Sequence, residues 1–427
     1  MATIRPFKAI RYNQKKVKIA SVVAPPYDVI SPEQQNGFYD KDPYNVIRLI
    51  LGREEDRYSS AAKTYNEWQQ QEILIRDSVP AIYPLVQTFT TTEGKQVQRK
   101  GFIALCRLEE FEKKIVLPHE KTLSKAKEDR FKLFKATNSN FSQVFSLYSD
   151  AEKKIDQFIN PVYAATPTID VEFENVRNQL WTITDQSTIA AIAAEMEPKQ
   201  VLIADGHHRY ETGLAYRDLM KSQNPNHTGN ELYNYIMMFF TNLDDEGLVI
   251  FPTHRAVHSL PNYDGAQLMA ALQTYFDVQV YATPQMMMEA LKKHDRFTYG
   301  FVSNHSSKFF VATLKSDSML DALVPDPLPR EVKELDVVLL HHYIIRQLLG
   351  VSQEAQEKKL NIHYLQSVQE CIDEIAAGKA QVAFFVNPTK IHQVRAVAKA
   401  GHTMPQKSTF FYPKLVSGLV MNKMSDE

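Results

Sequence analysis

Hydrophobic residues follow two different patterns along the chain. Short runs rich in apolar, aromatic and β-branched residues are typical of strands, and longer segments with an apolar residue at every third or fourth position are typical of amphipathic helices. Strands are predicted at 81–90, 98–108, 141–149, 168–174, 178–184, 201–203, 297–303, 308–314 and 381–387. Helices are predicted at 57–76, 265–276, 284–294, 331–349, 366–377 and 390–400. Because the two patterns alternate throughout, we expect a mixed α/β, or α+β, protein.

Turn-forming residues divide this pattern. Ser31-Pro32-Glu33-Gln34 predicts a helix start, since Ser is a good N-cap, Pro fits the first helical position and Gln can close a capping box. Glu93-Gly94 predicts a β-hairpin turn, and the run from Asp244 to Gly247 predicts a turn between two further paired strands. A loop at 262–265 marks the domain boundary. We therefore expect an N-terminal α/β region with the hairpin at 1–115, a core at 116–262 and a C-terminal α/β region at 263–427.

Charge and cysteine content narrow the class of protein. The chain carries 49 Lys and Arg against 50 Asp and Glu, a formal net charge of −1. Nucleic-acid binding depends on neutralising many phosphates, so this balance argues against a protein that coats nucleic acid. Cys106 and Cys371 are too few for a disulfide scaffold or a four-cysteine zinc site. The sequence shows neither a long apolar run nor an apolar leader, so we expect a cytoplasmic protein without a membrane span.

The segment Asp205-Gly206-His207-His208-Arg209 lies between a short apolar strand and a helical pattern. A helix N-terminus leaves unpaired backbone N–H groups and a partial positive charge, which suit an anion. Gly206 lacks the side chain that would keep a phosphate away. Arg209 and the histidines offer donors to phosphate oxygens, and Asp205 could bind Mg²⁺ or orient an attacking group. We predict that this turn handles phosphate.

Other segments carry groups that phosphoryl transfer needs. Glu120, within Pro118-His119-Glu120-Lys121-Thr122, lies in a predicted loop before a helix, where a carboxylate can accept a hydroxyl proton. Lys407-Ser408-Thr409 combines a cation with two hydroxyls, which could receive a carboxylate. His254 and Arg255 end a predicted strand and could line a cleft.

Structural interpretations of the same residues stay open. Asp205 could simply cap its helix, and Glu120 could be a solvated loop acid. A zinc site on the paired histidines of the turn with Glu211 is disfavoured, because adjacent histidines cannot easily reach one ion. His341 and His342 lie in an amphipathic pattern and are interpreted as core or interface. The sequence contains neither the P-loop motif nor the dinucleotide fingerprint, so neither of those folds is predicted.

Three segments resemble, in the same order, those of the archaeal ADP-dependent free serine kinases. PHEKTLSKAKEDRF is similar to their "PHE" loop and helix, IADGHHRYETGL to their "VDGHHRW" turn, and the stretch ending in MPQKSTFFYPK to their closing "SPKTTRH" segment. These kinases belong to the ParB/sulfiredoxin superfamily, in which a strand–turn–helix motif binds a nucleotide phosphate. The resemblance implies a ParB/sulfiredoxin-like core with added N-terminal and C-terminal α/β regions. Almost the whole chain also resembles a large bacterial family of unknown function.

The kinase resemblance implies a phosphotransferase that uses ATP or ADP with Mg²⁺ and accepts free L-serine or a similar hydroxy or amino acid. Glu120 would be the general base, and Asp205 would assist the hydroxyl or bind the metal. Phosphate contacts would come from Gly206, His207, His208 and Arg209. Lys407, Ser408 and Thr409 would meet the serine carboxylate or the product phosphate. Apart from the resemblance, we also expect His119, His254 and Arg255 to contact the substrate. The chain departs from the family at Thr409-Phe410-Phe411, where the kinases have threonine-arginine-histidine.

Two other functions use the same kind of turn. A ParB-like switch would bind or hydrolyse CTP or ATP and act through a partner or DNA, but the near-neutral charge and the lack of a helix-turn-helix pattern count against it. Sulfiredoxin-like redox repair needs a reactive cysteine in the turn, and a histidine stands there. The sequence leaves the donor nucleotide, the acceptor and the oligomeric state open.

Overall fold

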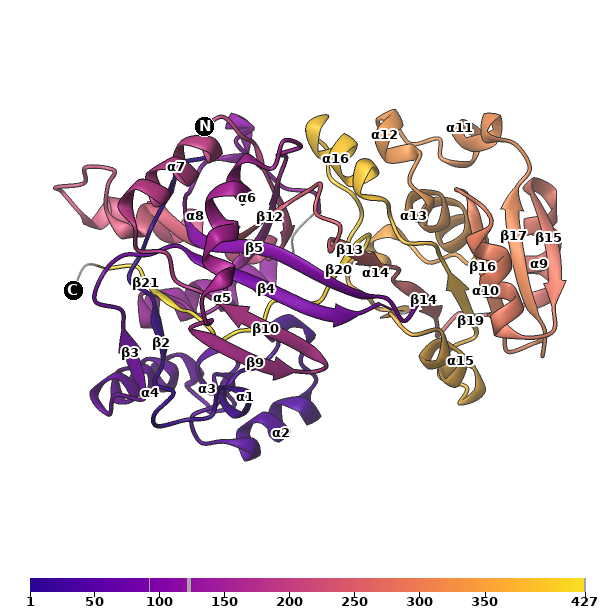
Figure 1. Ribbon diagram of the computed structural model, residues 1–427. Helices are drawn as coiled ribbons and strands as arrows, with labels where there is room; N and C mark the ends of the chain where they lie inside the picture. Colours follow the sequence, from indigo (N-terminus) through magenta and orange to yellow (C-terminus); the bar gives the residue numbers. More distant parts are fainter. Residues whose placement is uncertain (92, 121–123, 426–427) are drawn as a thin grey trace. The chain divides into compact units, whose positions relative to one another are not determined.

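The computed structural model describes residues 1–91, 93–120 and 124–425, and its helices and sheets confirm the mixed α+β class (Figure 1). The described parts of 1–118, 124–249 and 413–425 form one compact unit, which we call unit 1. Residues 119–120 and 250–412 form a second compact unit, unit 2. The division into three regions at 1–115, 116–262 and 263–427 remains a prediction.

Unit 1 is built on a sheet that has nine strands among the described residues. The strand order is β6–β11–β8–β12–β5–β4–β10–β9, and β1 pairs with β5. The pairs β11–β6 and β12–β8 are parallel, and β11–β8 and β12–β5 are antiparallel. The strands are β1 (Ile4–Arg5), β4 (Tyr83–Thr90), β5 (Gln96–Arg107), β6 (Val116–Leu117), β8 (Val144–Tyr148), β9 (Ile169–Phe173), β10 (Val176–Leu180), β11 (Val201–Asp205) and β12 (Tyr235–Asn242). Two small pairs are β2 (Ile10–Tyr12) with β3 (Leu74–Arg76), and β7 (Ser139–Asn140) with β21 (Asn422–Lys423).

The predicted hairpin is confirmed as β4 and β5, and its alternating residues build the core of unit 1. Phe102, Ala104 and Cys106 project from one face of β5 into a buried cluster, because successive side chains of a strand point to opposite faces. The helices α6 (Lys154–Ile159), α7 (Gln186–Met196) and α8 (His207–Gln223) contribute to the same cluster and lie on one side of the sheet in Figure 1. Strand β11 and helix α8 both contribute side chains to this core, so the turn that joins them lies at its edge.

The second predicted hairpin is wrong. Strand β12 pairs with β5 and β8, whereas the segment expected beside it forms β13 (Val249–Phe251) and β14 (His254–Val257). The turn itself exists, since the Asp245 side chain accepts a hydrogen bond of 2.8 Å from the Gly247 amide. However, a Cβ at Gly247 would lie only 2.0 Å from the Gln98 carbonyl oxygen. The turn therefore lies close against β5 at Gln98.

The remaining helices of unit 1 follow their local signals. Ser31 accepts a hydrogen bond of 3.2 Å from the Gln34 amide, and the Gln34 side chain accepts one of 2.9 Å from the Ser31 amide. This is the predicted capping box. The predicted helix at 57–76 ends at Gln70, because Glu72 takes a positive φ of 54° and the chain turns into β3. The helices are α1 (Ile19–Val22), α2 (Pro32–Lys41), α3 (Ile47–Ile50), α4 (Arg57–Gln70) and α5 (Ser124–Thr137).

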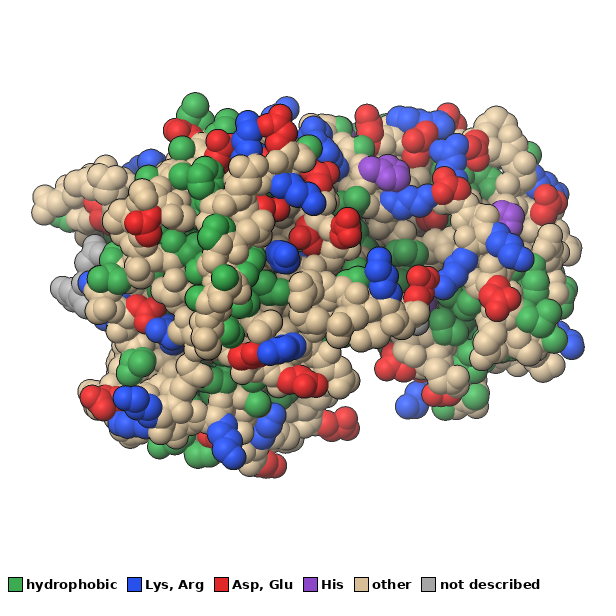
Figure 2. All heavy atoms as spheres, viewed as in Figure 1, with side chains coloured by type: hydrophobic (Ala, Val, Ile, Leu, Met, Phe, Trp, Pro, Cys, Tyr) green, Lys and Arg blue, Asp and Glu red, His purple; other side chains and the backbone are tan. Residues whose placement is uncertain are grey.

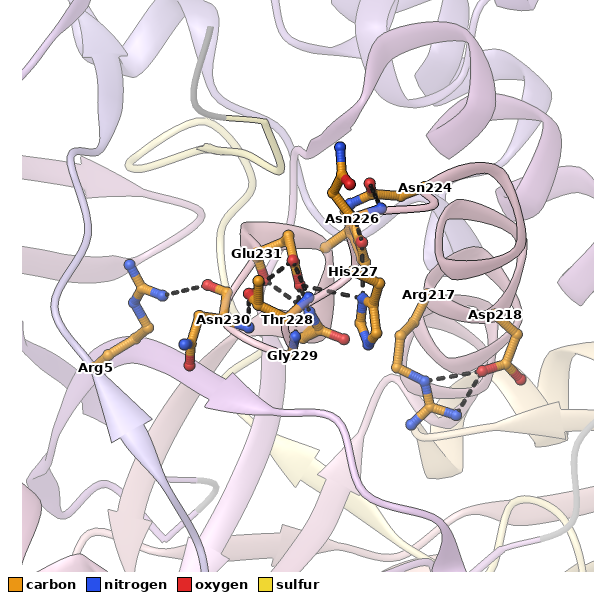
Figure 3. Close-up of polar contacts among 12 residues, drawn as sticks. Arg5, Arg217, Asp218, Asn224, Asn226, His227, Thr228, Gly229, Asn230 and Glu231 are labelled. Carbon is orange, nitrogen blue, oxygen red and sulfur yellow. Dashed lines mark hydrogen bonds and ion pairs between the residues drawn. The ribbon is translucent and has the colours of Figure 1, made fainter.

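The loop after α8 is held by one carboxylate (Figure 3). Glu231 accepts hydrogen bonds from the amide and hydroxyl of Thr228 and from the Gly229 amide, the last at 2.9 Å. Its other neighbours include the His227 ring, 3.1 Å away. Partial burial opposes ionisation, but these hydrogen bonds outweigh it and lower the pKa of Glu231 to about 2. The carboxylate therefore acts as the internal support of this loop.

Unit 2 contains a second sheet with the strand order β15–β17–β16–β19–β14–β18. Besides β14, its strands are β15 (Phe276–Tyr281), β16 (Thr298–Ser303), β17 (Phe309–Leu314), β18 (Ile362–Leu365) and β19 (Val382–Phe385). Strand β20 (Phe410–Tyr412) pairs with β13 in a separate two-stranded sheet. The helices are α9 (Gly265–Tyr275), α10 (Pro284–Lys292), α11 (Leu320–Leu323), α12 (Arg330–Lys333), α13 (Asp336–Leu339), α14 (Gln353–Glu357), α15 (Val368–Ala376) and α16 (Ile391–Lys399). The single helix predicted at 331–349 is divided into α12, α13 and a π-helix at Leu340–Leu348.

The surface agrees with the balanced charge of the sequence. On the face shown in Figure 2, basic and acidic side chains are scattered among one another. Within the part of the chain that the structure describes, we find no helix that is both long and apolar enough to cross a membrane.

Candidate functional site

The strand-to-helix turn of unit 1 has the geometry that its sequence predicts. Strand β11 contains a bulge before Asp205, which lies opposite Phe145 of β8, and a bulge re-aims the side chain that follows it. Gly206 is the N-cap of α8 and takes a left-handed φ of 88°. The Gly206 amide donates a hydrogen bond of 2.8 Å to the Asp205 carboxylate. The turn therefore presents Asp205 at the N-terminus of a long helix.

Gly206 also makes room for a neighbour. A Cβ at this position would lie 2.8 Å from the guanidinium atoms of Arg209. Arg209 is only 5% exposed and donates a hydrogen bond to the backbone carbonyl of Gln143. The guanidinium predicted to hold phosphate thus lies against the glycine and binds the main chain. His207 is buried beside it at 7% exposure. Burial lowers the pKa of His208, and the charge of Asp28 opposes this effect.

A second cation reaches this turn from the end of the chain. The Lys414 ammonium lies 2.9 Å from the Asp205 carboxylate, and both side chains are 19% exposed. Sequence reasoning passed over Lys414, because the ion pair joins residues 209 positions apart. Arg99 is fully buried on β5 and donates a hydrogen bond of 2.5 Å to the Pro413 carbonyl. Burial lowers the pKa of Arg99 to about 9, and the charges of Asp245 and Asp205 oppose this.

The segment Pro25-Pro26-Tyr27-Asp28 packs against a buried arginine of α5. Tyr27, which opens a short helix at Tyr27–Val29, has its ring centroid 3.9 Å from the guanidinium carbon of Arg130. Burial and the charge of Asp28 raise the pKa of Tyr27 to about 12, while Arg130 and Arg209 lower it. The positive charges of Arg130 and Arg209 therefore both act on the Tyr27 hydroxyl.

In unit 2 the structure brings together two of the predicted segments. Glu120 accepts a hydrogen bond of 3.2 Å from the Ser408 amide and lies 3.5 Å from the Thr409 hydroxyl. His119 is fully buried, and its Nε2 lies 2.9 Å from the same hydroxyl. The ring of Phe411 packs edge-on against His119 at 6.1 Å, so the aromatic residue that departs from the kinase pattern is a packing partner. Lys121 and Thr122, which follow Glu120 in the predicted segment, lie outside the described residues.

His254 and Arg255 are neighbouring buried residues of β14. Arg255 is fully buried and donates hydrogen bonds of 3.1 Å to the Lys407 carbonyl and of 3.1 Å to His341 Nε2. Burial lowers the pKa of Arg255 to about 10, and attraction to Tyr364 and Glu120 opposes this. His254 is also buried, and its Nδ1 accepts a hydrogen bond from a backbone amide. Arg255 thus holds the main chain at Lys407, and His254 holds the main chain at Val386, while their predicted contact with a substrate stays a prediction.

The turn offers one carboxylate, that of Asp205, to a Mg²⁺ ion. Among the described residues, no group of three or more His, Cys, Asp or Glu side chains could hold a metal ion. Mg²⁺ in nucleotide sites commonly uses one or two carboxylates and takes its other ligands from water and phosphate. Asp205 supplies one partly exposed carboxylate at a helix N-terminus, so it fits a Mg²⁺ ion that arrives with a nucleotide.

Comparison with known proteins gives a family and several structural likenesses. A conserved hypothetical protein from Pyrococcus furiosus is 13% identical, with 73% of this chain and 92% of that chain covered and a TM-score of 0.34. A free serine kinase in complex with AMP is 12% identical, covering 73% and 88% with a TM-score of 0.34. C-terminally truncated SbnI from Staphylococcus aureus is 9% identical, covering 74% and 86% with a TM-score of 0.34. No curated protein matches the sequence. The model of the family described as "Protein of unknown function (DUF1015)" matches residues 4–338, and the chain belongs to this family.

Proposed function

We propose that this protein is a small-molecule kinase that transfers a phosphoryl group from ATP or ADP to the hydroxyl of free L-serine or a similar hydroxy or amino acid. The observation that carries the proposal is the setting of Glu120. Its carboxylate is 19% exposed and accepts hydrogen bonds from the Ser408 amide and the Thr409 hydroxyl. Glu120 and these two residues belong to two of the three segments that resemble the kinases. A fixed, reachable carboxylate is what proton removal from an alcohol needs.

In the proposed reaction the acceptor hydroxyl oxygen attacks the terminal phosphorus of the nucleotide. A new P–O bond forms, and the P–O bond to the rest of the nucleotide breaks with its electron pair leaving on the nucleotide oxygen. The hydroxyl proton passes to the Glu120 carboxylate. His119 supports this step indirectly, since its Nε2 fixes the Thr409 hydroxyl that lies against Glu120.

Binding roles follow from exposure and donor chemistry. In unit 1, Asp205 would hold Mg²⁺, which neutralises phosphate charge when bound. The amides of His207 and His208, which follow Gly206, would meet phosphate oxygens. In unit 2, Lys407 and Ser408 would receive the acceptor carboxylate. Buried Arg255 would position this loop through the Lys407 carbonyl. Its neighbour His254 would hold the Val386 amide.

The test is phosphoryl transfer by the purified full chain. Protein is incubated with Mg²⁺ and either ATP or ADP and with a panel of L-serine, L-threonine and simple hydroxy acids, and products are identified by mass spectrometry. We expect phosphoserine or a close analogue. Glu120→Gln should lower the turnover rate by about 10²- to 10⁴-fold, because it removes the base. The amide oxygen can still accept from Ser408, so the loop should keep its shape.

The matched control is Glu112→Gln, which neutralises an exposed acid of unit 1. It should leave the rate unchanged. Equal rates for Glu120→Gln and the unchanged protein would remove Glu120 from the mechanism. Absence of phosphorylated product across the whole panel would refute the kinase, and nucleotide hydrolysis stimulated by DNA would replace it with a ParB-like switch.

A further inference from the structure

We propose that Lys414, which pairs with Asp205, is a phosphate-contacting residue of the Asp205 turn and turns to the nucleotide phosphate when nucleotide binds. The inference rests on the proposed function, because it assigns a further residue to the same site. Its starting point is the ion pair of 2.9 Å between the Lys414 ammonium and the Asp205 carboxylate.

Exposure distinguishes Lys414 from the arginine that the sequence favours. Arg209 is 5% exposed and lies against Gly206, with one nitrogen donating to the Gln143 carbonyl. Lys414 and Asp205 are each 19% exposed, so a ligand can reach both. A lysine ammonium is a compact cation on a flexible stem, and lysines of this kind commonly contact phosphates. Lys414 can therefore change partners, whereas Arg209 is part of the packing.

The backbone that carries Lys414 is firmly held. Residues 413–424, which we call the C-terminal strap, run through unit 1. Arg99 donates a hydrogen bond of 2.5 Å to the Pro413 carbonyl, and the Gln87 side chain donates one of 3.4 Å to the Lys414 carbonyl. Further along, the strap hydrogen-bonds to Gln143, Ala24, Ile10 and Asn138. Its apolar side chains from Leu415 to Met421 are almost fully buried. The structure therefore fixes the Lys414 backbone and leaves only its side chain to move.

Arg99 adds an independent sign that this place is prepared for negative charge. Its guanidinium is fully buried, and its Nε and Nη1 have no hydrogen-bond partner among the described residues. It rests 4.5 Å from the ring centroid of Phe145, which is the strand partner of Asp205. A buried arginine costs free energy unless its charge is compensated. Arg99 and Lys414 therefore bring two cationic side chains to the surroundings of Asp205, which favours an anionic ligand there.

The experiment is a calorimetric titration of the full chain with ADP, ATP and adenosine, with and without Mg²⁺. Lys414→Met should weaken ADP binding by about 10- to 100-fold, the range of one charge-assisted hydrogen bond, while adenosine binding stays unchanged. Lys414→Arg should restore most of the affinity. The matched control is Lys63→Met, which removes a lysine that is 78% exposed on α4 and should bind ADP normally. The loss should persist without Mg²⁺, because it concerns the phosphate itself.

Folding of each variant is checked first by the fluorescence of Trp68 and Trp181, both buried in unit 1. Lys414→Gln keeps a donor for Asp205 without the charge, so it should fold even if the methionine variant does not, and it should show the same loss. If the unchanged protein binds ADP and the Lys414 variants bind it equally well, the inference is wrong and the kinase proposal stands. If the unchanged protein binds no nucleotide at all, both are wrong.

Discussion

Replacing Gly206 by alanine tests whether the turn is built around Arg209. The backbone of Gly206 has a φ of 88°, which L-residues adopt only at a cost of about 1–2 kcal/mol. In addition, the new Cβ would lie 2.8 Å from the Arg209 guanidinium. The guanidinium has to move, and its hydrogen bond to the Gln143 carbonyl is then lost or weakened.

The two effects have different sizes and can be separated. A hydrogen bond from a charged group contributes about 1.5–3 kcal/mol, so Gly206→Ala should lower the free energy of unfolding by about 3–5 kcal/mol. Gly94→Ala is the matched control, because Gly94 has a φ of 79° and its Cβ would meet no atom within 4 Å. It should cost only about 1–2 kcal/mol. The difference between the two variants measures the contact with Arg209.

The assay is urea unfolding followed by tryptophan fluorescence. The chain has two tryptophans, Trp68 and Trp181, and both lie in unit 1, so the signal reports the unit that contains the turn. In an Arg209→Met background the cost of Gly206→Ala should fall to the Gly94 value. Equal costs for Gly206→Ala and Gly94→Ala, or strictly additive effects in this double-mutant cycle, would refute the reasoning.

Two further predictions concern protonation and the loop after α8. Burial and the charge of Arg255 lower the pKa of His254 and of His341 from 6.5 to about 3, so the unfolded chain binds protons that the folded chain does not. Stability should then be complete above pH 6.5 and fall below it by roughly 1.4 kcal/mol per pH unit for each histidine. Circular dichroism during unfolding at pH 7.5, 6 and 5 should show a smaller slope in His254→Asn and His341→Asn but not in a variant of exposed His392, and an unchanged slope would contradict the prediction. Glu231→Gln should speed hydrogen exchange in the 224–231 loop by about five-fold, because a neutral amide accepts more weakly than a carboxylate, and mass spectrometry showing equal protection would exclude that role.

Local chemistry determined those features that depend on neighbouring residues. The capping box at Ser31 formed as predicted, because its partners are three residues apart and its geometry is set by the first helical turn. The hairpin of β4 and β5 and the strand–glycine–helix turn at Asp205 also formed, since each needs only a short window of suitable residues. The pairing of β12 was predicted wrongly, because a nearby turn does not decide which strand lies alongside.

Tertiary structure alone decided which cations lie at these segments. Asp205 and Lys414 are 209 positions apart, and nothing in the local sequence of either indicates an ion pair. From its place at a predicted strand end, Arg255 could line a cleft, and only the fold shows that it is completely buried against the Lys407 carbonyl. The physical reason is that propensity, capping and turns act over a few residues, whereas burial and ion pairing depend on how distant strands are ordered in a sheet. The sequence by itself determined the strand–glycine–helix turn, and the folded chain decided that Lys414 lies against its carboxylate.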